Sequence, residues 1–285
     1  MKIAVLSGKG GTGKTLVSVN LAAVSDQAVY VDCDVEEPNG YLFFKPQNLE
    51  TEMVYIPIPQ VDESLCIGCR KCVDFCKFNA LAYIGNSLVI FEDICHSCGG
   101  CVIVCPQKAL SEKTKEIGEV KKGTSDNVIV LSGMMNIGEA SGIPIIKKLL
   151  KDESLDDSLT VIDCPPGSAC TVMESIKDAD YCILVAEPSI FGAHNLNLVV
   201  DLVRLFHKPH GVILNKCLDG INPSEEYCKE NGTHVIGSLP YDKELGTMNA
   251  IGLVAARESQ RYREVFTGLL QAVMKEVGHE ATSNT

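Results

Sequence analysis

Two runs of four cysteines with the same internal spacing lie in the first half of the chain and constrain its fold most strongly. They read Cys66-x-x-Cys69-x-x-Cys72-x-x-x-Cys76 and Cys95-x-x-Cys98-x-x-Cys101-x-x-x-Cys105. Thiolate sulfur is a soft ligand, and this spacing is typical of proteins that bind iron–sulfur clusters. A short apolar stretch follows each run, so we expect an internally repeated metal-binding insert.

The chain has 285 residues, of which 14 are cysteines, and it shows no signal peptide before its first apolar stretch. So many cysteines in an unexported chain favour metal ligation over disulfides, and we expect a cytoplasmic protein. Because exposed clusters are sensitive to oxygen, we expect an anaerobic organism. No apolar run is long enough to span a membrane, so no stable membrane insertion is expected. The net charge is −12 without a Lys/Arg-rich run, which argues against nucleic-acid binding.

A glycine-rich segment near the start matches G-x-x-x-x-G-K-[ST], the loop that binds nucleotide phosphates. Its residues are Gly8, Lys9, Gly10, Gly11, Thr12, Gly13, Lys14 and Thr15. The same glycines also satisfy G-x-G-x-x-G, which is typical of dinucleotide-binding loops. Lys14 and Thr15 favour a triphosphate site, because only that site needs an ammonium at the phosphates and a hydroxyl for Mg²⁺. A structural glycine turn is the remaining alternative.

Short apolar runs alternate with helical patterns outside the cysteine segment. We expect strands at residues 3–6, 28–31, 128–131, 159–162, 181–185, 212–214 and 234–236, and helices at 15–24, 145–150, 196–206 and 262–277. This alternation predicts an α/β fold with a doubly wound, mostly parallel sheet covered on both faces. The pattern breaks near Pro57 and Pro59, so we expect a discontinuous P-loop domain (1–59 and 113–285) with an inserted domain at 60–112.

The insert resembles bacterial two-cluster ferredoxins, which are small α+β domains. In such proteins the fourth cysteine of each run binds the cluster of the other run. The resemblance therefore implies two [4Fe–4S] clusters. The first would be held by Cys66, Cys69, Cys72 and Cys105, and the second by Cys76, Cys95, Cys98 and Cys101. A pair of zinc sites is the alternative, but it leaves the third and fourth cysteines of each run unexplained.

Outside the insert, the chain resembles the MinD/Mrp/ParA group of P-loop ATPases, whose loop reads KGGxGKT as residues 9–15 do. In that group the first lysine reaches across a dimer to the partner's nucleotide. The resemblance implies ATP and Mg²⁺ as ligands, a catalytic role for Lys9 and Lys14, and an ATP-dependent homodimer or a heterodimer with a paralogue. The alternative for Lys9 is a solvated loop lysine.

Further segments match this group in order. Asp32 and Asp34 fall at its first switch, and the resemblance implies that Asp34 orients the attacking water and that Asp32 assists at Mg²⁺. Asp163 and Gly167 lie in the segment DCPPG, which resembles the second switch. There Asp163, with Thr15, would hold Mg²⁺ and contribute to catalysis, and Gly167 would sense the γ-phosphate. The alternative is that acidic residues simply end strands.

The adenine contacts implied by the same resemblance are Asn215 and the pair Pro240 and Tyr241; a turn-capping asparagine is the alternative. Cys170 follows Asp163 by the spacing at which nitrogenase iron proteins place a ligand of their bridging cluster. Residues 132–138 offer no second cysteine, so we interpret Cys170 as an ordinary thiol. Cys33 and Cys164 adjoin the two switches and could be nucleotide-sensitive thiols.

These features together predict an ATPase in which nucleotide-driven dimerisation and switch motion gate electron transfer to a redox protein partner. Two alternatives stay open. An iron–sulfur cluster carrier of the Mrp type would need labile clusters, whereas full four-cysteine ligation favours retention. A MinD-like positioning ATPase would need a basic amphipathic C-terminal helix, which the acidic-to-neutral tail does not provide.

Overall fold

The computed structural model describes residues 1–155 and 158–283. Its main sheet contains β1 (Lys2–Leu6), β2 (Ala28–Asp32), β3 (Gln47–Val61), β6 (Leu110–Ser125), β7 (Val128–Met135), β8 (Leu159–Asp163), β9 (Tyr181–Ala186), β10 (His210–Cys217) and β11 (Val235–Pro240). The strand order is β11-β10-β9-β1-β8-β2-β7-β6-β3. Strands β11 to β7 in this order pair in parallel, which confirms the predicted mostly parallel sheet.

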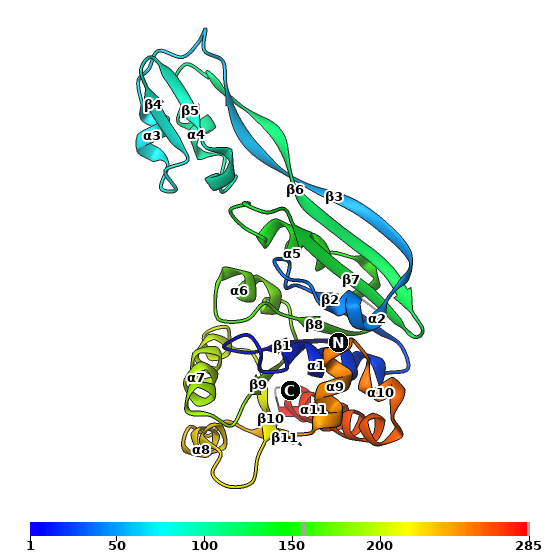
Figure 1. Ribbon diagram of the computed structural model, residues 1–285. Helices are drawn as coiled ribbons and strands as arrows, with labels where there is room; N and C mark the ends of the chain where they lie inside the picture. Colours follow the sequence, from blue (N-terminus) through cyan, green and yellow to red (C-terminus); the bar gives the residue numbers. More distant parts are fainter. Residues whose placement is uncertain (156–157, 284–285) are drawn as a thin grey trace.

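Helices cover both faces of this sheet (Figure 1). They are α1 (Lys14–Ala23), α2 (Gly40–Phe44), α5 (Ile143–Leu149), α6 (Cys170–Ile176), α7 (Ile190–Leu205), α8 (Pro223–Glu230), α9 (Lys243–Ala250), α10 (Ala255–Glu258) and α11 (Gln260–Ser283). In β1, Ala4 and Leu6 point to one core, shared with α5 to α8. Ile3 and Val5 point to the other, shared with α1 and α9 to α11. The buried strands are apolar on both faces because both faces are covered.

The α11 helix begins two residues before the apolar stripe predicted for it. Its buried residues Tyr262, Phe266 and Val273 belong to the core on the α1 face, so the stripe packs on the sheet. No helix in the described residues is long and apolar enough to cross a membrane.

A long antiparallel ribbon of β3 and β6 was not anticipated by the predicted strands. Its register runs from Gln47↔Thr124 to Val61↔Leu110. Strand β6 also pairs with β7, but only over residues 118–125. The pairing of β3 with β6 shifts by one residue between Val54 and Tyr55, where β6 leaves β7. The outer half of the ribbon therefore contains only two strands.

A small lobe lies at the far end of the ribbon (Figure 1). It contains α3 (Lys71–Phe75), β4 (Leu81–Ile84), β5 (Ser87–Ile90), a 3-10 turn (Glu92–Ile94) and α4 (Gly100–Ile103). Its small core is formed by Leu81, Leu88, Cys101 and Leu110. The α+β character agrees with the predicted insert, whereas the domain bounds at 60 and 112 stay a prediction.

Candidate functional site

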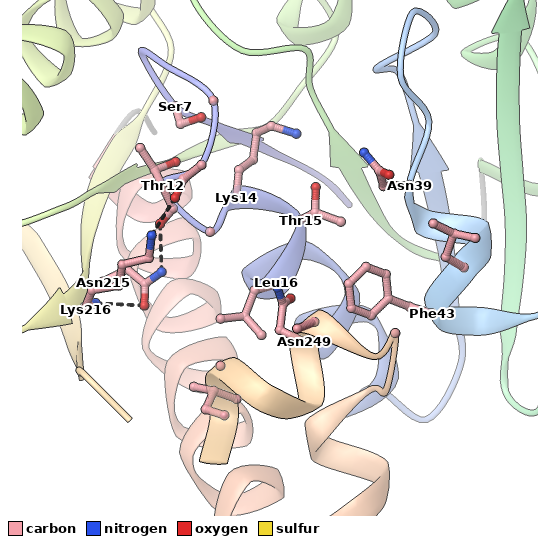
Figure 2. A pocket seen from close by; sticks show the side chains of 18 of the residues that line it. Ser7, Thr12, Lys14, Thr15, Leu16, Asn39, Phe43, Asn215, Lys216 and Asn249 are labelled. Carbon is pink, nitrogen blue, oxygen red and sulfur yellow. Dashed lines mark hydrogen bonds between the residues drawn. The ribbon is translucent and has the colours of Figure 1, made fainter. Parts of the chain in front are cut away.

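A cleft of about 790 Å³ opens beside the glycine loop (Figure 2). Nine of the predicted nucleotide-binding residues line it: Gly10, Gly11, Thr12, Gly13, Lys14, Thr15, Asn215, Pro240 and Tyr241. Gly8, Lys9 and Gly167 are not among the lining residues. The structure thus brings together segments that are far apart in the sequence.

The loop folds around two special backbone positions. Gly13 precedes α1 with φ 94° and Gly11 has φ 78°, a region that residues with a Cβ rarely adopt. A Cβ on Gly13 would also lie 2.1 Å from Nδ2 of Asn215. That amide donates a hydrogen bond to the Thr12 carbonyl at 2.7 Å. Asn215, predicted as an adenine contact, therefore also supports the phosphate-binding loop.

A buried ion pair lies at the base of the cleft. Nζ of Lys14 is 2.5 Å from Oδ1 of Asp163, and both side chains are less than a tenth exposed. Asp163 also accepts hydrogen bonds from Ser18 at 3.1 Å and from the Tyr30 hydroxyl at 2.8 Å. Burial disfavours the Lys14 charge, but Asp163 more than compensates, so the pKa of Lys14 is raised. For Lys14 to contact phosphates and Asp163 to contact Mg²⁺, this pair must separate.

The two acidic residues after β2 have different surroundings. Asp32 is buried and accepts hydrogen bonds from the backbone N–H groups of Asp34, Asn39 and Gly40 at 3.2, 3.0 and 2.8 Å. Burial, and then the nearby Asp163, raises the pKa of Asp32 to about 7. Asp34 lines the cleft, and burial raises its pKa to about 6. Asp34 is thus placed to accept a proton near neutral pH, whereas Asp32 holds the backbone of the following segment.

Lys9 lies outside the cleft. Its Nζ is 2.5 Å from Oε1 of Glu187, in the segment between β9 and α7, and its side chain is 35% exposed. Burial opposes ionisation of Glu187, but hydrogen bonds from Lys9 and Ser189 lower its pKa overall. In the single chain, Lys9 is therefore bound to its own subunit.

Sequence reasoning missed the apolar side of the cleft. Leu16, Phe43 and Asn249 line it from α1, α2 and α9 (Figure 2). The Oδ1 atom of Asn249 is buried and has no hydrogen-bond partner in the described residues. A flat heteroaromatic base with an exocyclic amine suits such a surface, because it offers apolar faces and a donor. Asp242 caps α9 by accepting hydrogen bonds from the Glu244 and Leu245 N–H groups. Its presence in the sequence could have indicated the start of this helix, but not that Asn249 faces the cleft.

The lobe contains two cavities, each lined by one predicted cysteine set. Cys66, Cys69, Cys72 and Cys105 line the first, and Cys76, Cys95, Cys98 and Cys101 line the second. Each cavity thus takes its fourth cysteine from the other run, although no group of three His, Cys, Asp or Glu among the described residues could hold a single metal ion. Burial raises the thiol pKa of Cys101 to about 11. Four sulfurs around one cavity fit a [4Fe–4S] cluster.

Four of the remaining cysteines are buried in the main core. They are Cys33, Cys164, Cys182 and Cys228. Burial raises the thiol pKa of each, to about 12 for Cys182 and about 11 for Cys228, so these thiols are poor nucleophiles. Cys170 is exposed at the start of α6.

A single lysine connects the lobe to the main sheet domain. Nζ of Lys115, on the outer part of β6, is 2.8 Å from Oδ1 of Asp93 in the lobe and 3.0 Å from Oε2 of Glu139. Glu139 lies between β7 and α5, and Lys115 and Glu139 are 15% and 9% exposed. Asp93 lies two residues before Cys95. The pairing therefore connects the loop after β7 to the second cysteine cavity.

The end of β7 and Gly142, just before α5, contact the segment that follows Asp34. The Met135 N–H donates to the Val35 carbonyl at 2.8 Å. The Val35 side chain fills the space beside two glycines, since a Cβ on Gly133 or Gly142 would lie 2.9 or 2.4 Å from a Val35 methyl group. A shift of Val35 toward these glycines would therefore displace them, because close-packed neighbours cannot interpenetrate.

Comparison with known proteins adds to this geometry. Residues 3–253 match the family described as the CobQ/CobB/MinD/ParA nucleotide binding domain. The structure is similar to the cell division ATPase MinD of Pyrococcus furiosus, with a TM-score of 0.61 and 19% identity over 96% of this chain and 98% of that one.

Two of the similar proteins have names that denote iron–sulfur proteins. An iron–sulfur cluster carrier protein of Methanococcus maripaludis is 24% identical over 302 residues, covering 96% of this chain and 86% of its own. A ferredoxin of Pyrobaculum islandicum is 38% identical over 63 residues, which are 21% of this chain and 58% of the ferredoxin. These similarities agree with a MinD-like fold that carries a ferredoxin-like insert.

Proposed function

The chain belongs to the CobQ/CobB/MinD/ParA family of nucleotide-binding proteins, and we propose that it is a Mg²⁺-dependent ATPase in which bound ATP controls electron transfer through two [4Fe–4S] clusters. The active form is an ATP-dependent dimer, of two identical chains or of this chain with a paralogue. The electron donor or acceptor is a redox protein.

One observation carries this proposal: the lobe with the eight cysteines is tied to the nucleotide side of the molecule through Lys115. Its partner Glu139 lies in the loop between β7 and α5, and the two ends of this loop contact Val35. Val35 directly follows Asp34, which lines the cleft. Two modules joined only by a flexible linker would not need such a contact. The Lys115–Glu139 pair is largely buried, whereas Asp93 on the lobe side is 80% exposed, so a shift of the loop would act on the lobe by moving Lys115.

At the nucleotide end, Lys14 would leave Asp163 to contact the γ-phosphate, and Asp163 with Thr15 would hold Mg²⁺. Asp34 then accepts the proton of the attacking water, and the released phosphate allows the lysine–aspartate pair to form again. A segment ordered by the γ-phosphate and released on hydrolysis is a two-state element of the kind that nucleotide switches use.

At the redox end, iron–sulfur clusters supply one-electron chemistry. The chain's own residues hold the clusters through the eight cysteines and position the lobe through Lys115. Because Cys69 and Cys98 are exposed, each cavity has one side that a redox partner can approach.

The test is the rate at which the anaerobically reconstituted protein, reduced by dithionite, passes electrons to an artificial dye. We expect the rate to differ between Mg²⁺ with a non-hydrolysable ATP analogue and Mg²⁺ with ADP. Identical rates and identical cluster potentials in both states would refute nucleotide control, while leaving ATP hydrolysis untouched.

Cluster delivery is a second candidate, favoured by the similarity to an iron–sulfur cluster carrier protein over most of both chains. It predicts that iron and sulfide move to an apo-ferredoxin acceptor within minutes. Retention of both clusters through repeated reduction and oxidation, with no acceptor reconstituted, supports the electron-transfer proposal instead.

A further inference from the structure

A buried serine hydroxyl in the lobe has no hydrogen-bond partner. The Ser97 Oγ atom is one of three such side-chain atoms in the part of the chain that the structure describes. The other two, on Thr12 and Asn249, belong to residues that line the nucleotide cleft. Buried polar atoms in folded proteins nearly always have partners, so an orphan atom indicates a missing group.

Ser97 lies between Cys95 and Cys98 and lines the second cysteine cavity together with its four sulfurs. Its backbone has φ 52°, a left-handed conformation that is uncommon for residues other than glycine. Serine therefore occupies a position where glycine would be less strained and would leave no unpaired hydroxyl.

The first cysteine run shows the alternative solution. Gly68 occupies the matching position between Cys66 and Cys69, with φ 69°. A Cβ there would lie 2.5 Å from the Tyr83 hydroxyl oxygen, so a side chain at this position would have to displace Tyr83. The two repeats thus differ at one cavity-lining hydroxyl.

A hydroxyl next to a cluster can donate a hydrogen bond to a cluster or thiolate sulfur. Reduction adds one electron to the cluster, and no bond breaks and no proton moves. The reduced form carries more negative charge, so a donor to sulfur stabilises it more than the oxidised form and raises the reduction potential.

We propose that the Ser97 hydroxyl donates a hydrogen bond to a sulfur of the cluster held by Cys76, Cys95, Cys98 and Cys101, and thereby raises the reduction potential of that cluster. The first cluster, beside Gly68, lacks this donor, so the two clusters are unequal in this respect. The proposal rests on the proposed function only for the presence of the two clusters.

The experiment is an anaerobic redox titration of the full reconstituted chain, without nucleotide, monitored by EPR. Ser97→Gly and Ser97→Ala are compared with the parent. Ser64→Ala is the control, because Ser64 is an exposed lobe serine that bonds Asp62 and lines neither cavity. We expect both Ser97 variants to lower one midpoint potential and leave the other unchanged.

The expected change in the reduction equilibrium is about fivefold, the size of one ordinary hydrogen bond. At 59 mV per tenfold for one electron, this is a fall of about 40 mV. Parent potentials in both Ser97 variants would overturn the proposal, as would loss of iron from Ser97→Gly, which would assign the hydroxyl to holding the loop. Because no nucleotide is present, failure of ATP control would leave this result intact.

Discussion

The two lysines of the glycine loop have similar chemistry but different partners. Lys14 is buried against Asp163, whereas Lys9 is partly exposed and paired with Glu187. The loop motif predicts both residues, since their spacing from the glycines is readable in the sequence. The partners of these lysines could not be predicted from the motif, because Asp163 and Glu187 are brought to the loop only by the neighbouring strands β8 and β9.

Replacing each lysine separates binding from hydrolysis. Lys14→Ala should weaken ATP binding by about 10- to 100-fold, because a charge-assisted contact to phosphate is lost. Lys9→Ala should keep ATP binding but lose ATP-dependent dimerisation and hydrolysis. Calorimetric titration and phosphate release measure the two effects, with circular dichroism to verify folding. If both variants bind and hydrolyse ATP like the parent, the assignment of the loop is wrong.

Among the elements, the β3–β6 ribbon matters most for coupling, because it carries both the lobe and Lys115. The ribbon could not be predicted from the apolar runs used for the parallel strands. Strand β6 reads LSEKTKEIGEVKKGTS, and such a charged strand forms because β3 offers a backbone partner along its length and β7 a second one over residues 118–125. The crossed grouping of the cysteines follows from the resemblance to two-cluster ferredoxins, and as cluster ligation it stays a prediction.

Lys115→Met tests coupling through the ribbon. The matched control is Lys113→Met, because Lys113 lies on the same strand and, among the described residues, pairs with Glu92 of the lobe and not with Glu139. We expect Lys115→Met to keep its iron content and ATP hydrolysis but to lose most of the ATP-dependent change in dye reduction. A similar loss in Lys113→Met would show that any loosening of the lobe suffices.

The proposal that the fourth cysteine of each run binds the cluster of the other run can be tested separately. Cys76→Ala should remove the cluster bound by the second run and spare that of the first, even though Cys76 belongs to the first run. Cys105→Ala should do the reverse. Iron analysis should fall from about eight to about four atoms per chain in each variant, with different residual EPR spectra. Loss of the same cluster in both would contradict the crossed assignment.

For the whole molecule, the proposed ATP-dependent dimer requires Lys9 to leave its own subunit. Glu187→Gln removes the charge that holds it. Because a partly exposed ion pair contributes at most about 1 kcal/mol, we expect ATP-dependent dimerisation to tighten by no more than about fivefold. Sedimentation velocity with ATP measures this, with Glu225→Gln as the control for an exposed pair. A weaker dimer would mean that Glu187 itself contacts the partner subunit.

The parallel architecture was predictable at this scale, since strand and helix patterns alternate along the chain. The residues that line the cleft could be predicted only in part. Phe43 and Asn249 reach it from α2 and α9, and no local pattern reveals that these two short helices face the same loop. Such placements depend on the closing of the whole sheet and not on the residues beside them.

The shift in pairing at Val54 and Tyr55 has a mechanical consequence. Beyond it, the two-stranded arm is about eight residues long in β6, or roughly 27 Å at about 3.4 Å per residue. A rotation of about 10° at its root would sweep the tip through roughly 5 Å, by simple leverage over that span. A small displacement beside the triphosphate would thus produce a larger displacement of the cysteine cavities, without any need for the lobe itself to change shape.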